Sequence, residues 1–133
     1  MRMRTNFIVA LFFGLTFVVS IAAIEPAQEK SEFKNLQVLP KDISTKDLKQ
    51  IMVDEFQDGL GVGCGYCHVK KEGSLLLDYP SDEKPEKQIA RAMMRMTLDI
   101  NATYFEVERP LIGEDRLVIS CTSCHRGTSH PEK

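Results

Sequence analysis

The apolar residues divide the chain into an N-terminal apolar run and two later segments with helical periodicity. The run covers residues 7–24, carries no charge and follows Arg2 and Arg4. Small residues such as Ala22 near its end favour cleavage, whereas its length as a helix, about 27 Å, approaches the ~30 Å hydrocarbon thickness of a bilayer. Residues 1–24 are therefore predicted to be either an export signal peptide or a membrane anchor. The positive-inside rule places the rest of the chain outside the cytoplasm.

The first periodic segment lies in DISTKDLKQIMVDEFQ, residues 42–57. Four apolar residues share one face of the predicted helix: Leu48, Ile51, Met52 and Phe56. Ser44 and Thr45 are candidate N-caps, and the GLGVG stretch at residues 59–63 ends the helix. The glycines allow the chain to fold back, so that the residues after them lie opposite Met52.

The second periodic segment is SDEKPEKQIARAMMRMTLDINATYF, residues 81–105. Acidic residues and Pro85 near its start are typical of a helix N-terminus. One apolar stripe runs along it and consists of Ile89, Met93, Met96 and Ile100. A methionine stripe of this kind is most often core packing.

The two stretches CGYCH, residues 64–68, and CTSCH, residues 121–125, contain all four cysteines and two of the three histidines. A disulfide within either pair would close a small strained ring, and pairing between the motifs would leave the histidines unexplained. A single zinc site fits poorly, because the two motifs lie further apart than the roughly 15–20 residues of the usual pattern. A thioredoxin-like redox pair accounts for neither the duplication nor the histidines.

Covalent haem attachment accounts for every member of both motifs. Two thiols three residues apart reach the two vinyl groups on one edge of a porphyrin, and the following imidazole faces the iron. We therefore predict two c-type haems, one bound by Cys64, Cys67 and His68 and the other by Cys121, Cys124 and His125. Zinc and redox chemistry remain the minor alternatives. Attachment of c-type haem outside the cytoplasm agrees with export, so we expect a periplasmic protein.

Composition places this chemistry in one small domain. The 133 residues have a net charge of −2, interspersed acids and bases, and no tryptophan. The sequence has no basic stripe that would indicate nucleic-acid binding. We expect a linker at residues 25–34 and one domain at residues 35–130, in which the haems replace part of a limited apolar core.

The histidine of each motif leaves one further ligand position on the haem iron. This position is filled by Met, by His, or by no side chain. The spare histidine, His130, is too close to His125 to reach the opposite haem face easily, and we interpret it as solvated. The methionines of the two predicted helices are therefore the candidates.

Four stretches, NLQVLPKDIS, CGYCHV, SDEKPEKQIARAMMRMTLDIN and ISCTSCHRG, together resemble the cytochrome subunit of photosynthetic reaction centres. The resemblance covers residues 35–127 and implies one dihaem half of a tetrahaem architecture. It implies a mostly α fold made of two helix–turn–helix haem-binding units. The positions matched by the resemblance imply that Met52 is the axial ligand of the first haem iron and Met93 that of the second. Met96 is then a packing residue.

The chain departs from this pattern before the second motif. Residues 107–109 and 116–119 are strand-like and flank a turn, so a short β-hairpin is expected there.

With His and Met on both irons, the predicted function is electron transfer rather than catalysis. We expect a relay of single electrons to or from redox partner proteins, such as a membrane oxidoreductase or a reaction centre. The alternative is a dihaem peroxidase or a haem-based sensor, each with one open iron.

Four lysines flank the first motif and are interpreted as a solvated face: Lys70, Lys71, Lys84 and Lys87. Three arginines are weak candidates for pairing with haem propionates: Arg91, Arg95 and Arg126.

Overall fold

The computed structural model describes residues 33–131, which form several helices and one small sheet. The elements in chain order are α2 (Thr45–Ile51), η1 (Met52–Asp58), η2 (Cys64–Tyr66), β1 (Val69–Lys70), β2 (Leu77–Asp78), α3 (Pro85–Tyr104) and α4 (Cys121–His125). The expectation of a mostly α fold is confirmed. The predicted signal or anchor at residues 1–24 lies outside the described residues. None of the helices between residues 33 and 131 is long and apolar enough to cross a membrane.

The first helix begins where the sequence predicts and then changes type. Ser44 is the N-cap of α2, and its hydroxyl accepts a hydrogen bond from the Asp47 backbone N–H at 3.1 Å. From Met52 to Asp58 the helix continues as the π-helical η1. The helical prediction holds for the whole segment, but its second half is wound more widely than the α-helix expected. Such π segments are rare and are frequent at functional sites.

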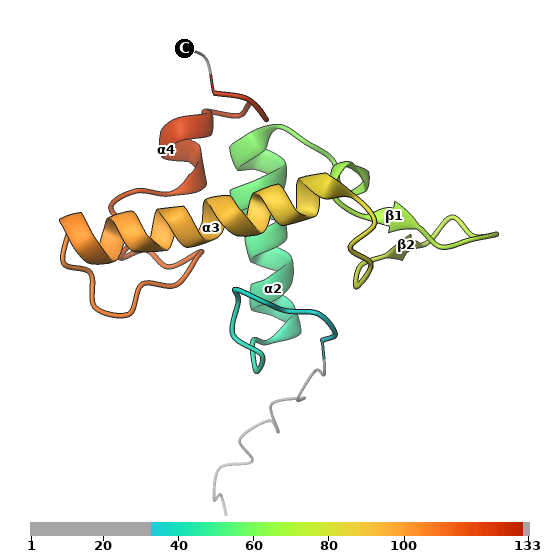
Figure 1. The fold of residues 1–133 in the computed structure, drawn as a ribbon, viewed down its shortest axis with the longest axis horizontal. Coiled ribbons are helices and arrows are strands. Elements are labelled where there is room, and N and C mark those ends of the chain that lie inside the picture. Colours follow the sequence, from blue (N-terminus) through green and yellow to red (C-terminus); the bar gives the residue numbers. More distant parts are fainter. Residues whose placement is uncertain (1–32, 132–133) are drawn as a thin grey trace, which may run out of the picture.

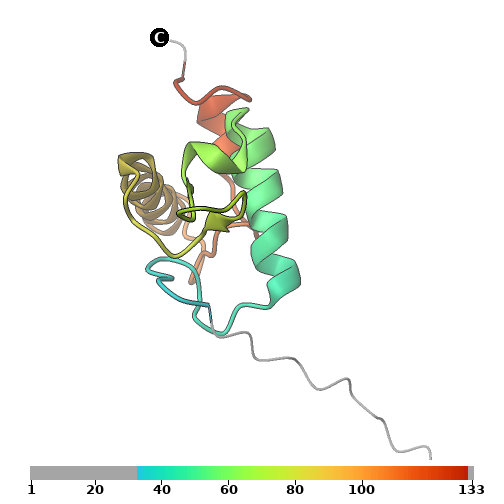
Figure 2. The same ribbon diagram turned by 90° about the vertical axis from the view of Figure 1, so that its right-hand side faces the viewer.

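Helix α3 begins at Pro85, as the sequence predicts, and lies crosswise to α2 (Figures 1 and 2). Its buried face carries Met94, which joins Leu39, Ile51 and Ile112 in the core cluster. The apolar stripe predicted from periodicity does not face this core. Ile89, Met93 and Met96 are 57%, 41% and 47% exposed. The apolar stripe of α3 is thus left open in the polypeptide alone.

The predicted β-hairpin before the second motif is wrong. Residues 105–120 contain no strand, and Glu106 and Arg109 adopt positive φ angles of 55° and 48°, which interrupt an extended chain. The sheet lies instead between the first motif and α3. There β1 pairs with β2 in antiparallel register, with Val69 opposite Asp78.

The glycines after η1 bring the segment just before the first Cys-x-x-Cys-His motif against the second motif. Gly59 is buried, and a Cβ at this position would lie 3.1 Å from Thr122 Oγ1 in α4. Its carbonyl accepts the Gly127 N–H at 2.9 Å. Gly61 has a φ of +65°, and a Cβ there would overlap the Gly127 carbonyl. These glycines therefore permit close backbone contact with the second motif, besides turning the chain as predicted.

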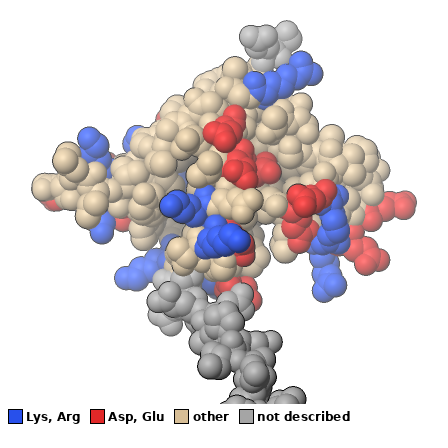
Figure 3. All heavy atoms as spheres, turned by 180° about the vertical axis from the view of Figure 1, so that it is seen from behind, with Lys and Arg blue, Asp and Glu red and all other residues tan. Residues whose placement is uncertain are grey.

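Charged side chains of both signs are interspersed on the face of the molecule opposite the view of Figure 1 (Figure 3). Neither sign predominates over this face as a whole, in agreement with the nearly balanced composition.

Candidate functional site

The first motif forms a tight turn directly after the glycine stretch. Residues Cys64–Tyr66 form a single 3₁₀ turn, and the His68 N–H donates to the Cys64 carbonyl at 3.1 Å. Cys64 is exposed, whereas Cys67 is partly buried. Burial, followed by the charge of Glu86, raises the pKa of the Cys67 thiol. The turn places both sulfurs and the imidazole on one short stretch of backbone.

His68 lies in a partly buried environment formed by β2 and α3. Its ring contacts the Tyr79 ring edge-on, with the ring centroids 5.0 Å apart. Its Nδ1 is buried and lacks a well-formed hydrogen bond, although the Tyr79 carbonyl lies close enough to influence the ring. Burial, with the charge of Lys87 second, lowers the pKa of His68, and that carbonyl acts in the opposite direction. This environment favours the neutral imidazole, the form that binds metals.

Cationic side chains from the start of α3 bind backbone carbonyls of the first motif and of the segments around it. Lys84 Nζ donates to the Gly65 carbonyl inside the motif. Lys87 Nζ donates to the carbonyls of Tyr79 and Ser81, at 2.7 Å each. Arg91 is buried and bonds the Asn35 carbonyl at 3.0 Å. Lys84, Lys87 and Arg91 therefore bind protein groups here, so the interpretation of Lys84 and Lys87 as a solvated face is wrong.

Asp82 carries the negative charge that balances this cationic group. Its carboxylate lies 2.9 Å from Arg91 Nη1 and 3.2 Å from Lys87 Nζ. Hydrogen bonds from Arg91, then from Asn35, hold the pKa of Asp82 well below its usual value of 3.8. A carboxyl group with a lowered folded-state pKa stabilises the fold above its unfolded pKa, and that contribution is lost as the pH falls through the folded pKa.

We therefore expect part of the acid sensitivity of the protein to depend on Asp82. In the wild type, the free energy of unfolding should decline as the pH falls below about 4, with Asp82 contributing to the slope. Asp82→Asn should be less stable at neutral pH and should show a shallower decline. Denaturant unfolding between pH 7 and pH 2 measures both. An unchanged slope in the variant would contradict this role, and Asp99→Asn, which removes an exposed carboxylate of α3, serves as a control.

The second motif forms α4, a helix of a little more than one turn. Ser120 and Ser123 form a capping box at its start. The Glu55 carboxylate of η1 accepts the Cys121 N–H at 3.2 Å. Cys121 is buried, and burial, followed by the hydrogen bond and charge of Glu55, raises the pKa of its thiol to about 12. The Glu55 contact attaches the start of α4 to the helix that carries Met52.

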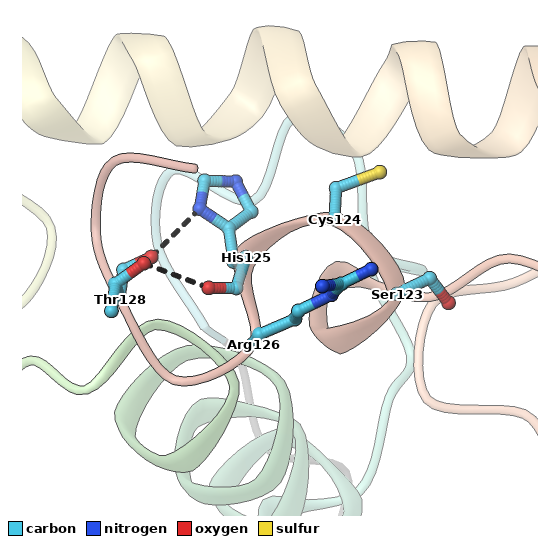
Figure 4. Close-up of a pocket in the computed structure, with 5 residues that line it drawn as sticks. All are labelled: Ser123, Cys124, His125, Arg126 and Thr128. Atoms are coloured by element: carbon cyan, nitrogen blue, oxygen red, sulfur yellow. Dashed lines mark hydrogen bonds between the residues drawn. The ribbon is translucent and has the colours of Figure 1, made fainter. Parts of the chain in front are cut away.

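The His125 ring is held by a hydrogen bond at one ring nitrogen, which leaves the other available as a metal ligand. Its Nδ1 lies 3.0 Å from the Thr128 carbonyl (Figure 4). A carbonyl oxygen can only accept, so Nδ1 carries the proton and Nε2 of the neutral ring is free. A backbone partner on the second nitrogen is the usual arrangement of a metal-ligating histidine. Arg126 follows in the left-handed conformation, which ends the helix and returns the chain toward His125.

The side chains of Cys124 and His125 both point toward α3 (Figure 4), and both residues line a hollow of about 370 Å³. The hollow is lined by Ser123, Cys124, His125, Arg126 and Thr128. A thiol and an imidazole facing the same open space are two of the three groups with which this motif would bind a c-type haem, and the third, the Cys121 thiol, is buried at the start of the same helix.

The residues present fit covalent haem at both motifs. All four cysteines are unpaired with one another. Within residues 33–131, no group of three or more His, Cys, Asp or Glu side chains is placed to hold a metal ion, so the alternative of one zinc shared by both motifs does not fit. The open apolar stripe of α3 is also the kind of surface that a porphyrin would cover.

The two predicted axial methionines have different surroundings. Met93 lies on the exposed stripe of α3, and its neighbour Met94 is 5% exposed in the core. Met52 stands where α2 becomes η1 and packs, partly buried, against the core cluster. The fold therefore puts the two methionines on the two helices that the sequence assigns to them.

Together, the mostly helical fold and the two Cys-x-x-Cys-His turns define the class of a c-type cytochrome. Residues 16–133 match the family described as photosynthetic reaction centre cytochrome C subunit. The chain belongs to this family, as its motifs predicted.

A curated relative is cytochrome c-554 of Chloroflexus aurantiacus, which is 34% identical over 91 residues. The match covers 68% of this chain and 20% of the relative, so the chain spans about a fifth of the length of that protein. No solved structure matches.

Sequence reasoning did not assign a role to Glu55 or to Asn101. Glu55 lies beside the apolar face of its helix, and nothing in the sequence indicates a contact with Cys121. Asn101 offered a clearer signal, because asparagine is unfavourable inside a helix unless its side chain has a specific partner. In the structure Asn101 is 0% exposed.

Proposed function

We propose that the chain is a dihaem c-type cytochrome that relays single electrons outside the cytoplasm. The observation that carries the proposal is the pair of Cys-x-x-Cys-His turns, each of which carries two cysteines and one histidine on a single short turn. Family membership supports the cofactor class. Bound haem supplies one-electron redox chemistry at its iron.

The chain contributes attachment, orientation and burial to this function. Cys64 and Cys67 would hold the first haem and Cys121 and Cys124 the second, with His68 and His125 as proximal ligands. The hydrogen bond from His125 Nδ1 to Thr128 supports the ring orientation that ligation through Nε2 requires. Met52 and Met93 are proposed as the remaining axial ligands.

A backbone contact between the segment just before the first motif and the second motif supports internal electron transfer. Gly59 packs against α4, and the Gly59 carbonyl bonds Gly127 just after the second motif. Groups attached to both motifs would then be held at a constant separation by the backbone, rather than by flexible side chains.

We further propose that residues 35–130 form the haem domain, after a linker at 25–34 and an export signal or anchor at 1–24. The basic and apolar pattern of that N-terminus supports a periplasmic location, with or without attachment to the inner membrane. A membrane oxidoreductase or a reaction centre is the proposed class of redox partner. This assignment makes the chain an electron carrier and not an enzyme.

A redox titration of the purified haem protein tests the proposal. We expect two one-electron equivalents per chain, a six-coordinate low-spin spectrum in both oxidation states, and no binding of carbon monoxide by the reduced protein. A dihaem peroxidase or a haem sensor has an open or displaceable ligand. Rapid carbon monoxide binding at one iron, or turnover of peroxide, would favour those alternatives.

A further inference from the structure

Asn101 makes more hydrogen bonds than any other side chain of α3 described here, and it makes them while fully buried. Its Oδ1 accepts the N–H groups of Val118 at 2.8 Å and of Ile119 at 3.2 Å. Its Nδ2 donates to the carbonyls of Ile119 at 2.7 Å and of Thr97 at 2.9 Å. An amide side chain has two N–H donors and two acceptor positions, so the hydrogen-bonding capacity of Asn101 is fully used.

Three of these four bonds go to the two residues at 118 and 119, which lie shortly before α4. This segment pairs with no strand. The Asn101 amide therefore satisfies the backbone groups that a neighbouring strand would otherwise satisfy. Its loss would leave up to three backbone groups of a partly buried segment without partners, which the fold would relieve by moving the segment.

The position of α4 depends on this attachment because α4 is short. Five residues cannot fix their own orientation. The helix is held at its start by Glu55, which bonds Cys121, just after its end by the bond from Gly127 to Gly59, and along its approach by Asn101. Of these contacts, the one through Asn101 connects α4 to α3. Met93 lies eight residues before Asn101 on the same helix, about 12 Å along a rigid axis.

We propose that Asn101 is a positioning residue for the second haem. By holding residues 118 and 119 against α3, it fixes the distance between His125 on α4 and Met93 on α3, so that both reach the same iron. The inference rests on the proposed function, in which these two residues are the axial ligands. The first haem, whose Met52 and His68 lie elsewhere, should not depend on Asn101.

The test uses Asn101→Asp in the full-length haem protein. The variant is nearly isosteric, but the carboxylate turns both donors into acceptors that face the carbonyls of Thr97 and Ile119. We expect the proton signal of the iron-bound Met93 methyl group to be lost from the NMR spectrum of the reduced protein. We expect the Met52 signal to remain and the potential of the second haem to fall. Substitution of each methionine by Leu assigns the two signals.

Two further variants separate positioning from general stability. Ile112→Val loosens the core without touching the Asn101 bonds, and both methionine signals should remain. Asn101→Gln keeps the amide but moves it along the side chain, and it should weaken the Met93 signal selectively. Because thioether attachment is covalent, the haem count by mass should be the same in all variants.

The outcomes distinguish this inference from the proposed function. If wild type carries two haems with two methionine signals, and both signals survive in Asn101→Asp and Asn101→Gln, the positioning role is overturned. Equal loss of both signals in both variants overturns it as well, since Asn101 would then support the whole fold. A wild type without two haems overturns the proposed function itself.

Discussion

Met93→Leu and Met52→Leu should each remove the methionine ligation of one haem and leave the other intact. Each variant should lose about half of the charge-transfer absorption that reports methionine sulfur bound to ferric iron, because two such ligands are proposed. Leu keeps nearly the volume of Met, so packing should change little. The potential of the affected haem should fall or its spectrum should become high-spin, since the methionine ligand raises the potential. Absorption spectra and potentiometric titration of both variants provide the measurements.

Two neighbouring methionines provide matched controls for Met93. Met96 lies one turn further along the same exposed stripe, and Met94 is buried in the core. Met96→Leu and Met94→Leu should leave the absorption at its wild-type intensity. If Met96→Leu removed half of it and Met93→Leu none, the ligand of the second iron would be Met96, and the assignment of Met93 would be wrong.

Gly61→Ala should strongly destabilise the fold where the chain enters the first motif. A Cβ at Gly61 would overlap the backbone carbonyl of Gly127, and backbone cannot move aside as a flexible side chain can. The φ of +65° adds strain for any residue with a side chain. We expect a loss of about 3 kcal/mol in the free energy of unfolding, combining left-handed strain with overpacking. Denaturant unfolding of the haem protein measures this loss.

Gly73→Ala separates the effect of backbone strain from that of the steric overlap. Gly73 also has a left-handed φ, +68°, but no atom lies within 4 Å of a Cβ built there. Gly73→Ala should therefore lower the free energy of unfolding by about 1 kcal/mol, from backbone strain alone. Gly61→Ala should also disturb the spectra of both haems, because Gly61 precedes the first motif by three residues and contacts Gly127 just after the second, whereas Gly73→Ala should disturb neither. Equal destabilisation by both substitutions would contradict the importance of the Gly61 contact with Gly127.

The local features of the fold were predictable from the sequence. The N-cap at Ser44 and the start of α3 at Pro85 follow from side-chain chemistry that acts within one helical turn. The two Cys-x-x-Cys-His turns are equally local. The family followed from the combination of these motifs, and the comparison confirmed it.

The features that were not predictable depend on contacts between distant residues. The face of α3 that packs against the core carries Met94, whereas periodicity alone selected the stripe containing Met93. The hairpin prediction failed because the side chain of Asn101 binds residues 118 and 119 in place of a strand. Likewise, the bond between Glu55 and Cys121 joins residues whose proximity only the folded chain creates.

Intact mass spectrometry of the mature protein, followed by mapping of its peptides, tests the central claim most directly. The account predicts two haem additions per chain, one on the peptide containing Cys64 and Cys67 and one on the peptide containing Cys121 and Cys124. No free thiol should remain. A single haem, or unmodified cysteines in either motif of the protein purified from its natural compartment, would contradict the account.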